Sequence, residues 1–299
     1  MADAQRKYKD RLFGFLFGGE INREWTLSLY NAVNGSHYTD ASQIEISTIR
    51  EVLYLGMHND VSFMISDEMN MYEQQSSFNP NMPLRMLQYA ASLFERHVEN
   101  LQRSKYSSRL IHLPTPRLVV FYNGRDDMPD EQVLRLSDAF AEEKRELSDI
   151  DVRVRMVNIN KGHSLQLMSL CKPLDEYAWM VDCIRQSKAS RSLEEAIDFA
   201  IDIMPGSFEI KPCMELHRAE VKGMLLTEYN EAKERERLAM EAKAEGRAEG
   251  EAKGRAEYLA EMVIKMLRKH LPLAYITDLT DADEATIRRI AREANLAIV

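Results

Sequence analysis

The stretch from residue 59 to residue 75 contains an aspartate, a glutamate and a carboxamide with the spacing of a metal site. Its alternating apolar residues predict two short strands joined by a turn at residues 66–68. Asp60 begins the first strand and Glu73 and Gln75 lie near the end of the second, so antiparallel pairing would bring all three together. Glu73 and Gln75 are two residues apart and project from the same face of a sheet. Oxygen ligands of this kind suit a hard divalent cation such as Mg²⁺.

The alternative for these acidic side chains is an ordinary solvated surface, which is where most carboxylates lie. Two features favour a site. Glu73 and Gln75 directly follow an apolar run, and the next segment reads as a loop and then a long amphipathic helix over about residues 83–102. Arg85 and Tyr89 are four residues apart on that helix and share one face. An arginine stacked over a surface aromatic ring is the competing interpretation of this pair.

Composition limits the classes of function. The chain has 299 residues and a formal net charge of −9, so bulk charge does not indicate a strongly basic nucleic-acid binder, although an acidic tail can mask a local basic groove. Cys171, Cys183 and Cys213 are scattered and odd in number, which favours structural thiols in a reducing cytoplasm. Cys213 and His217 have half of a zinc spacing without a second pair. No signal peptide and no apolar run of membrane-spanning length is evident, so we expect a soluble cytoplasmic protein without a membrane partner.

The first 160 residues predict a mixed sheet with helices packed against it. The strand at 151–159 follows a predicted helix at 130–147, and strand–helix–strand order of this length predicts a crossover between two parallel strands. The strand at 116–124 is continuously apolar, which predicts burial on both faces. The remaining expected elements are a helix at 6–18, a helix between an Asn22 cap and Gly35, and one or two strands within 43–56.

Beyond about residue 172 the pattern is helical throughout. We therefore expect a sheet domain at 1–172, a helical extension at 173–240, a charged Ala/Glu/Gly/Arg repeat at 241–256 that is a linker or helix, and a small helical unit at 257–299 with Asp281 or Asp283 as a cap. The repeat glycines would each weaken an isolated helix by about 1 kcal/mol relative to alanine. Pairing of the C-terminal helices with a second chain, giving a homodimer, would offset that cost.

Four segments follow one another along the chain: YKDRLFGFLFG, NDVSFMI, MNMYEQQSSFNPNMPLRMLQY and VVFYNG. In this order they resemble the Rpn family. These proteins are the recombination-promoting nucleases, also known as putative transposases, of the PD-(D/E)XK nuclease superfamily. The resemblance covers most of the chain, including the C-terminal Glu-Gly-Arg-Ala repeats and the small helical unit after them.

The resemblance implies a restriction-endonuclease-like α/β (α+β) core at residues 1–172 that hydrolyses DNA phosphodiester bonds. Asp60 would be the metal-binding aspartate and Glu73 the acid of the Glu-x-Lys pair, with Mg²⁺ as cofactor and Mn²⁺ as a substitute. Gln75 stands where the superfamily usually has lysine, and members of this family often carry glutamine there. A neutral carboxamide can position groups but cannot deprotonate water, so the metal would activate the water largely by itself.

Three further residues receive roles from the same resemblance. Glu24, on the first turn of an early helix, would supply an additional metal-binding carboxylate, or is simply a helix N-terminal charge favoured by the dipole. Arg85 and Tyr89 would face the scissile phosphate or the adjacent DNA backbone.

A rival function is a catalytically quiet DNA-binding or assembly protein in which the C-terminal helices form a helix-turn-helix-like unit. Its phosphate contacts would be Arg288, Arg289 and Arg292. A helical oligomerisation tail that delivers two active sites to two DNA strands is a third possibility, and it is compatible with the nuclease. Recombination, mobile-element movement and defence against phage would all use the nuclease chemistry.

Overall fold

A six-stranded mixed sheet forms the centre of the protein in the computed structural model, which describes residues 12–19, 22–46 and 60–298. The expected helical residues 6–11 and most of the strand signal within 43–56 lie outside the described residues. The strand order is β1-β2-β3-β4-β6-β5. The strands are β1 (Glu45–Ile46), β2 (Val61–Ile65), β3 (Glu68–Gln75), β4 (Thr115–Tyr122), β5 (Glu131–Arg135) and β6 (Arg153–Asn158).

Strands β2 and β3 form the expected antiparallel hairpin, in which Val61 pairs with Tyr72 and Ile65 with Glu68. The turn consists of Ser66 and Asp67, with φ angles of 46° and 59°. Left-handed backbone at both turn positions matches the right-handed twist of the flanking strands, which is why a two-residue connection suffices. The hairpin prediction is confirmed, with Glu68 opening the second strand.

Strands β3, β4 and β6 are parallel, so their carboxyl ends meet at one edge of the sheet. In β4, Val119 and Phe121 belong to one hydrophobic cluster and Val120 and Tyr122 to the other. The expected burial of this strand on both faces and its parallel pairing with β6 are therefore confirmed.

The predicted helix at 130–147 is wrong. Its first residues form strand β5, which pairs antiparallel with β6 at the sheet edge, and the rest forms two 3-10 turns, η3 (Leu136–Ala139) and η4 (Glu142–Leu147). Leu134 is buried against the sheet while Val133 is exposed, a period of two rather than 3.6. No residue of η4 is buried, so that segment has no apolar stripe with which a helix could pack.

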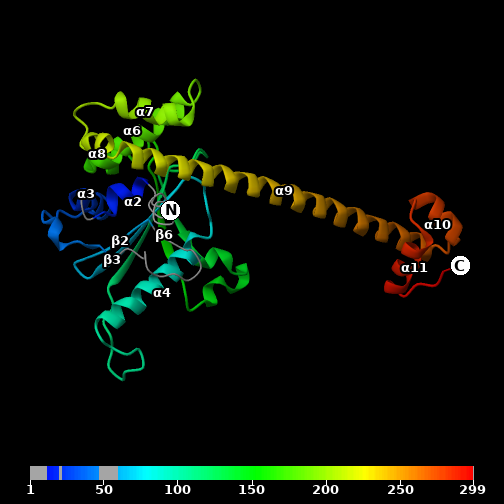
Figure 1. Ribbon diagram of the computed structural model, residues 1–299. Helices are drawn as coiled ribbons and strands as arrows, with labels where there is room; N and C mark the ends of the chain where they lie inside the picture. Colours follow the sequence, from blue (N-terminus) through cyan, green and yellow to red (C-terminus); the bar gives the residue numbers. More distant parts are fainter. Residues whose placement is uncertain (1–11, 20–21, 47–59, 299) are drawn as a thin grey trace, which may run out of the picture. The chain divides into compact units, whose positions relative to one another are not determined.

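Helices cover both faces of the sheet and make an α+β architecture. One face carries only α4 (Met82–Asn100) among the described helices, close to the expected bounds, and a Met- and Tyr-rich cluster fills that layer. Figure 1 shows α4 and the pair α2–α3 on opposite sides of the strands. The helices of the second face are α2 (Leu12–Phe17), α3 (Arg23–Asn34), α5 (Leu165–Leu170), α6 (Lys172–Ser187), α7 (Leu193–Asp202) and α8 (Lys211–Leu216).

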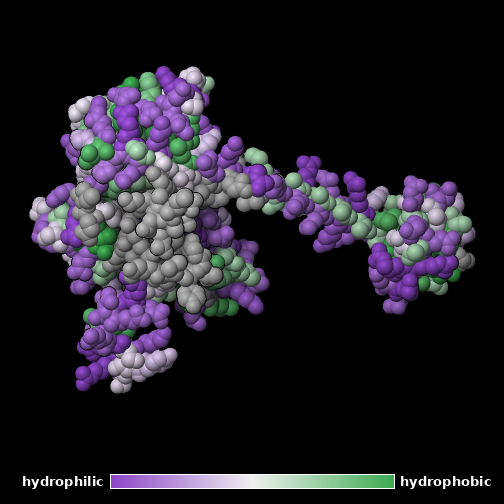
Figure 2. All heavy atoms as spheres, in the orientation of Figure 1, coloured by the Kyte–Doolittle hydropathy of each residue, from purple (hydrophilic) through white to green (hydrophobic). Residues whose placement is uncertain are grey.

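Two compact units divide the chain, Met1–Ala232 and Lys233–Val299. Helix α9 (Arg218–Arg268) contains the glycine repeat and contributes residues to both units, so the repeat is helix rather than linker; in Figure 2 its middle carries mostly hydrophilic side chains. The second unit packs the end of α9 against α10 (Leu273–Thr280) and α11 (Glu284–Glu293). Asp283 caps α11 by accepting the Thr286 N–H at 2.6 Å, which confirms one of the two expected caps.

Candidate active site

Asp60 and Glu73 lie beside each other at one end of the β2–β3 hairpin. The pairing of Val61 with Tyr72 places Asp60, the preceding residue, opposite Glu73. Oδ2 of Asp60 accepts the backbone N–H of Gln74 at 2.6 Å, which fixes the aspartate against β3. Cross-strand neighbours point to the same face of a sheet, so both carboxylates lie on the α4 side.

Glu73 and Gln75 also face α4, as their two-residue spacing predicts. Both are buried, with 2% and 6% of their surface exposed. Nη2 of Arg85 donates to Oε1 of Glu73 at 2.6 Å, and Nε2 of Gln75 lies 2.6 Å from Sδ of Met82. The hairpin strand and the first turn of α4 therefore build the site jointly.

Arg85 and Tyr89 contact each other across one helical turn, as their spacing of four predicts. Nη2 of Arg85 donates to the Tyr89 hydroxyl at 2.9 Å. Burial raises the pKa of Tyr89, and the negative charges of Glu73 and, more weakly, Asp60 raise it further, while Arg85 lowers it. Both carboxylates are therefore close enough to act electrostatically on this hydroxyl, and five of the six predicted site residues come together.

Glu24 is the exception. It is exposed on the first turn of α3, a helix whose apolar residues belong to the opposite face of the sheet from α4. Within the described residues, no hydrogen bond or ion pair joins Glu24 to Asp60 or Glu73.

The donor set suits Mg²⁺ in chemical type, because Asp60, Glu73 and Gln75 all offer oxygen. Oε1 of Gln75 is buried and has no hydrogen-bond partner among the described residues, which is the state expected of an oxygen held for a ligand. Among the described residues, no group of three or more His, Cys, Asp or Glu side chains is arranged to hold a metal ion. A cation here would thus depend on two carboxylates and the Gln75 carboxamide, and Arg85 would have to release Oε1 of Glu73 for that atom to bind it.

A second polar cluster occupies the opposite face at the same edge, and the sequence did not reveal it. Gln74, which points away from α4, donates from Nε2 to Oδ1 of Asn123, and Nδ2 of Asn123 donates to the Tyr177 hydroxyl at 3.1 Å. Arg185 of α6 donates from Nη1 to Oδ1 of Asn160 at 2.7 Å and from Nη2 to the backbone oxygen of Asn123. The available signal was an asparagine within two residues of the end of each of two buried strands, Asn123 after β4 and Asn160 after β6.

The C-terminal arginines are largely engaged within their own helix. Arg288 pairs with Glu284 at 3.4 Å and Arg289 with Glu293 at 3.0 Å, each four residues away, and Arg292 donates to the backbone oxygen of Arg288. All three side chains lie on the exposed side of α11. The pairing reduces the positive field that the rival DNA-binding function requires.

The thiols offer no reactive centre. Burial raises the pKa of Cys171 to about 11 and also raises the pKa of Cys183 and of Cys213. Raised pKa values leave thiols protonated at neutral pH, and protonated thiols are poor nucleophiles and poor metal ligands.

Comparisons with protein-family models, curated proteins and solved structures gave no match. Among the described residues, no helix has both the length and the apolarity to cross a membrane.

Proposed function

We propose that the protein is a Mg²⁺-dependent DNA endonuclease that hydrolyses phosphodiester bonds, with Asp60, Glu73 and Gln75 as its catalytic residues. The observation that carries the proposal is the convergence of Asp60 and buried Glu73 across the hairpin, beneath Arg85 and Tyr89. The Rpn-like order of sequence segments gives the same residues the same roles. Their position at the carboxyl ends of β3, β4 and β6 also supports a site, because ligands of α/β sheets bind at that edge.

The chain's own groups have separable tasks in this chemistry. Asp60 and Glu73 would hold Mg²⁺, or Mn²⁺ in its place, with the Gln75 oxygen as a neutral third donor. The bound ion supplies an activated water and neutralises charge that develops on the phosphate. Arg85 already donates to Glu73 and would transfer from it to the phosphate, since a guanidinium matches phosphate geometry. Tyr89 then limits the directions in which Arg85 can move.

The proposed enzyme would be a cytoplasmic homodimer. The C-terminal helices would pair two chains into a dimer, and two active sites would allow both DNA strands to be cut. The three cysteines are all free thiols, which supports a cytoplasmic location. Recombination or mobile-element movement is the cellular process that such an enzyme would serve.

A supercoiled-plasmid assay tests the function. We expect nicked and linear products with Mg²⁺ or Mn²⁺ and none with EDTA, and Asp60→Asn should abolish cleavage while leaving the fold intact, because asparagine keeps an acceptor oxygen for the Gln74 N–H. Asp151→Asn, at the surface ion pair with Arg135, is the matched control and should cleave normally. Full cleavage by Asp60→Asn would remove the assignment.

One observation favours the rival function, a catalytically quiet DNA-binding or assembly protein. Helices α10 and α11 are joined by three residues and α11 has a formed N-cap, as in helix-turn-helix units. A wild-type protein that never cleaves, but loses DNA affinity when Arg288, Arg289 and Arg292 are replaced together by glutamine, would support the rival.

A further inference from the structure

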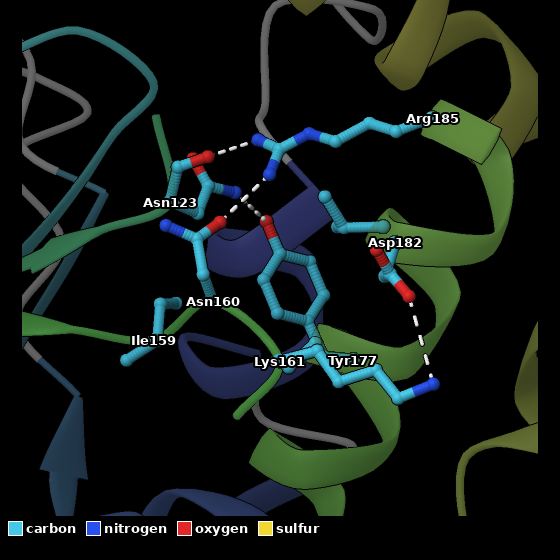
Figure 3. A pocket seen from close by; sticks show the side chains of 9 residues that line it. Asn123, Ile159, Asn160, Lys161, Tyr177, Asp182 and Arg185 are labelled. Atoms are coloured by element: carbon cyan, nitrogen blue, oxygen red, sulfur yellow. Dashed lines mark hydrogen bonds and ion pairs between the residues drawn. The ribbon is translucent and has the colours of Figure 1, made fainter. Parts of the chain in front are cut away.

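A pocket of about 60 Å³ opens at the carboxyl edge of β4 and β6, on the face of the sheet opposite α4 (Figure 3). None of the residues given roles in the nuclease lines it. Its polar lining consists of Asn123, Asn160, Lys161, Tyr177, Asp182 and Arg185.

Arg185 is fixed in this pocket by neutral oxygens. Its guanidinium reaches from α6 to Oδ1 of Asn160 at 2.7 Å and to the backbone oxygen of Asn123. Asn160 is itself oriented, because its Nδ2 donates to the Gly124 carbonyl at 3.0 Å. These bonds use two of the five N–H donors of the arginine and leave the others for a ligand.

The pocket has an excess of positive charge. Among the described residues, no carboxylate forms an ion pair with Arg185. The one acid in the lining, Asp182, pairs instead with Lys161 at 3.6 Å and accepts from Gln186 at 2.8 Å. Burial lowers the pKa of Arg185 and nearby Arg125 lowers it further, while Tyr177 and Asp182 raise it. A desolvated cation without a carboxylate partner is costly, and a bound anion would offset that cost.

The pocket is one strand away from the candidate active site. Gln74 directly follows Glu73 in β3 and donates to Asn123, whose own N–H donates to the Gln75 carbonyl at 2.9 Å. Neighbouring strands lie about 4.8 Å apart. Because the two places lie on opposite faces of the sheet, a polymer with regularly spaced charges would contact both by crossing this edge.

We propose that Arg185 and Lys161 bind a phosphate group in this pocket. An arginine fork with free N–H donors and a lysine point charge are the usual protein partners of phosphate oxygens. The part of the proposal that identifies the phosphate as a DNA backbone phosphate flanking the cleaved bond rests on the proposed nuclease function. A free nucleotide or inorganic phosphate presents the same chemistry.

The test uses the full-length protein with EDTA present, so that binding is measured without cleavage. A fluorescently labelled DNA duplex is titrated by anisotropy, and inorganic phosphate and a deoxynucleoside monophosphate are titrated by thermal shift. The variants are Lys161→Met and Arg185→Met, and the matched control is Arg135→Met, an exposed arginine in a surface ion pair. We expect each pocket variant to bind the duplex roughly tenfold more weakly at low salt, with the slope of log affinity against log salt reduced by about 1.

The outcomes separate this proposal from the nuclease. Lys161 is 55% exposed, so Lys161→Met decides the question even if Arg185→Met does not fold. If phosphate or the nucleotide no longer raises the melting temperature of Lys161→Met while its affinity for the duplex is normal, the pocket binds phosphate and its ligand is a free phosphate compound. If Lys161→Met binds all three probes as tightly as the wild-type protein does, the phosphate-binding proposal is wrong, even if the wild-type protein cleaves plasmid. Weakened duplex binding by a protein that never cleaves supports the pocket and removes the nuclease.

Discussion

Arg85 donates from a single nitrogen, Nη2, to Oε1 of Glu73 at 2.6 Å and to the Tyr89 hydroxyl at 2.9 Å. Glu73 is almost fully buried and the Arg85 side chain is 29% exposed, so the guanidinium supplies a counter-charge to a carboxylate in the core. The same oxygen is a candidate metal ligand. The contact therefore links the stability of the fold to the availability of Oε1 of Glu73 for a metal ion.

Replacing Arg85 should expose that link. Arg85→Met removes the ion pair between Arg85 and the buried Glu73 carboxylate, and we expect a loss of about 2 kcal/mol in the free energy of unfolding, measured with urea. The double variant Arg85→Met/Glu73→Gln should recover most of it. Arg117→Met, at the ion pair with Glu68 where the arginine is 51% exposed, is the control and should cost below about 1 kcal/mol. Equal losses for both single variants would contradict a special role for the buried pair.

Arg85→Met should lower the stability of the fold but raise its affinity for a metal ion. If Arg85 competes for Oε1 of Glu73, Arg85→Met should bind Mn²⁺ more tightly than the wild type in calorimetric titrations, while plasmid cleavage falls because the phosphate loses its guanidinium. Glu73→Gln should lose both binding and cleavage. Unchanged Mn²⁺ affinity in Arg85→Met would show that the arginine does not compete.

Replacing Gln75 should reduce cleavage with little effect on the stability of the fold. Its Oε1 has no hydrogen-bond partner among the described residues, so Gln75→Met, which keeps volume and removes the carboxamide, should change the free energy of unfolding by less than about 1 kcal/mol. Metal-dependent cleavage should fall about tenfold or more, because the bound ion would lose its neutral third oxygen donor and even groups outside the ligand set cost about tenfold when removed. Cleavage at the wild-type rate would leave the carboxamide without a catalytic role.

The first compact unit should be sufficient for chemistry. A chain ending at Ala232 retains both hydrophobic clusters of the sheet and every candidate site residue. We expect it to unfold cooperatively and to nick plasmid. Gel filtration with light scattering should show a monomer, and the plasmid assay should give less linear product than the full-length protein does. An unchanged oligomeric state would place the dimer contact in the first unit.

Glu176 should make stability depend on pH. Its carboxylate is buried and accepts the N–H groups of Glu209 and Ile210, each at 3.0 Å, and burial raises its pKa in the folded state. Because the folded protein holds this proton more tightly, the stabilisation is complete below the unfolded pKa of about 4.3 and is lost as pH rises through the folded pKa. Relative to Glu176→Gln, the wild type should therefore lose stability as pH rises above about 4. A flat or rising difference in urea titrations would contradict this.

The sequence alone determined the β2–β3 hairpin, the α4 helix and the doubly buried β4 strand. Each depends on a local signal, namely the hydrophobic period and the turn residues. The parallel pairing of β4 with β6 was expected from a crossover helix at 130–147, and the pairing is present although that helix is not. Because antiparallel register and helical spacing are also local, the approach of Asp60 to Glu73 and of Arg85 to Tyr89 could be predicted as well.

Only the tertiary structure decided the remainder. Residues 130–147 contain good helix formers, yet the open edge of β6 offered β5 hydrogen bonds and burial for Leu134, and long-range pairing overrode local propensity. The contact of Arg85 with Glu73 and the pocket around Arg185 join segments that are far apart in the chain. No residue pattern encodes such distances, because they follow from how helices dock on a sheet. The sequence thus indicated the candidate groups of the hairpin and of α4, and packing decided that Arg85 meets Glu73 and that Arg185 meets Asn160.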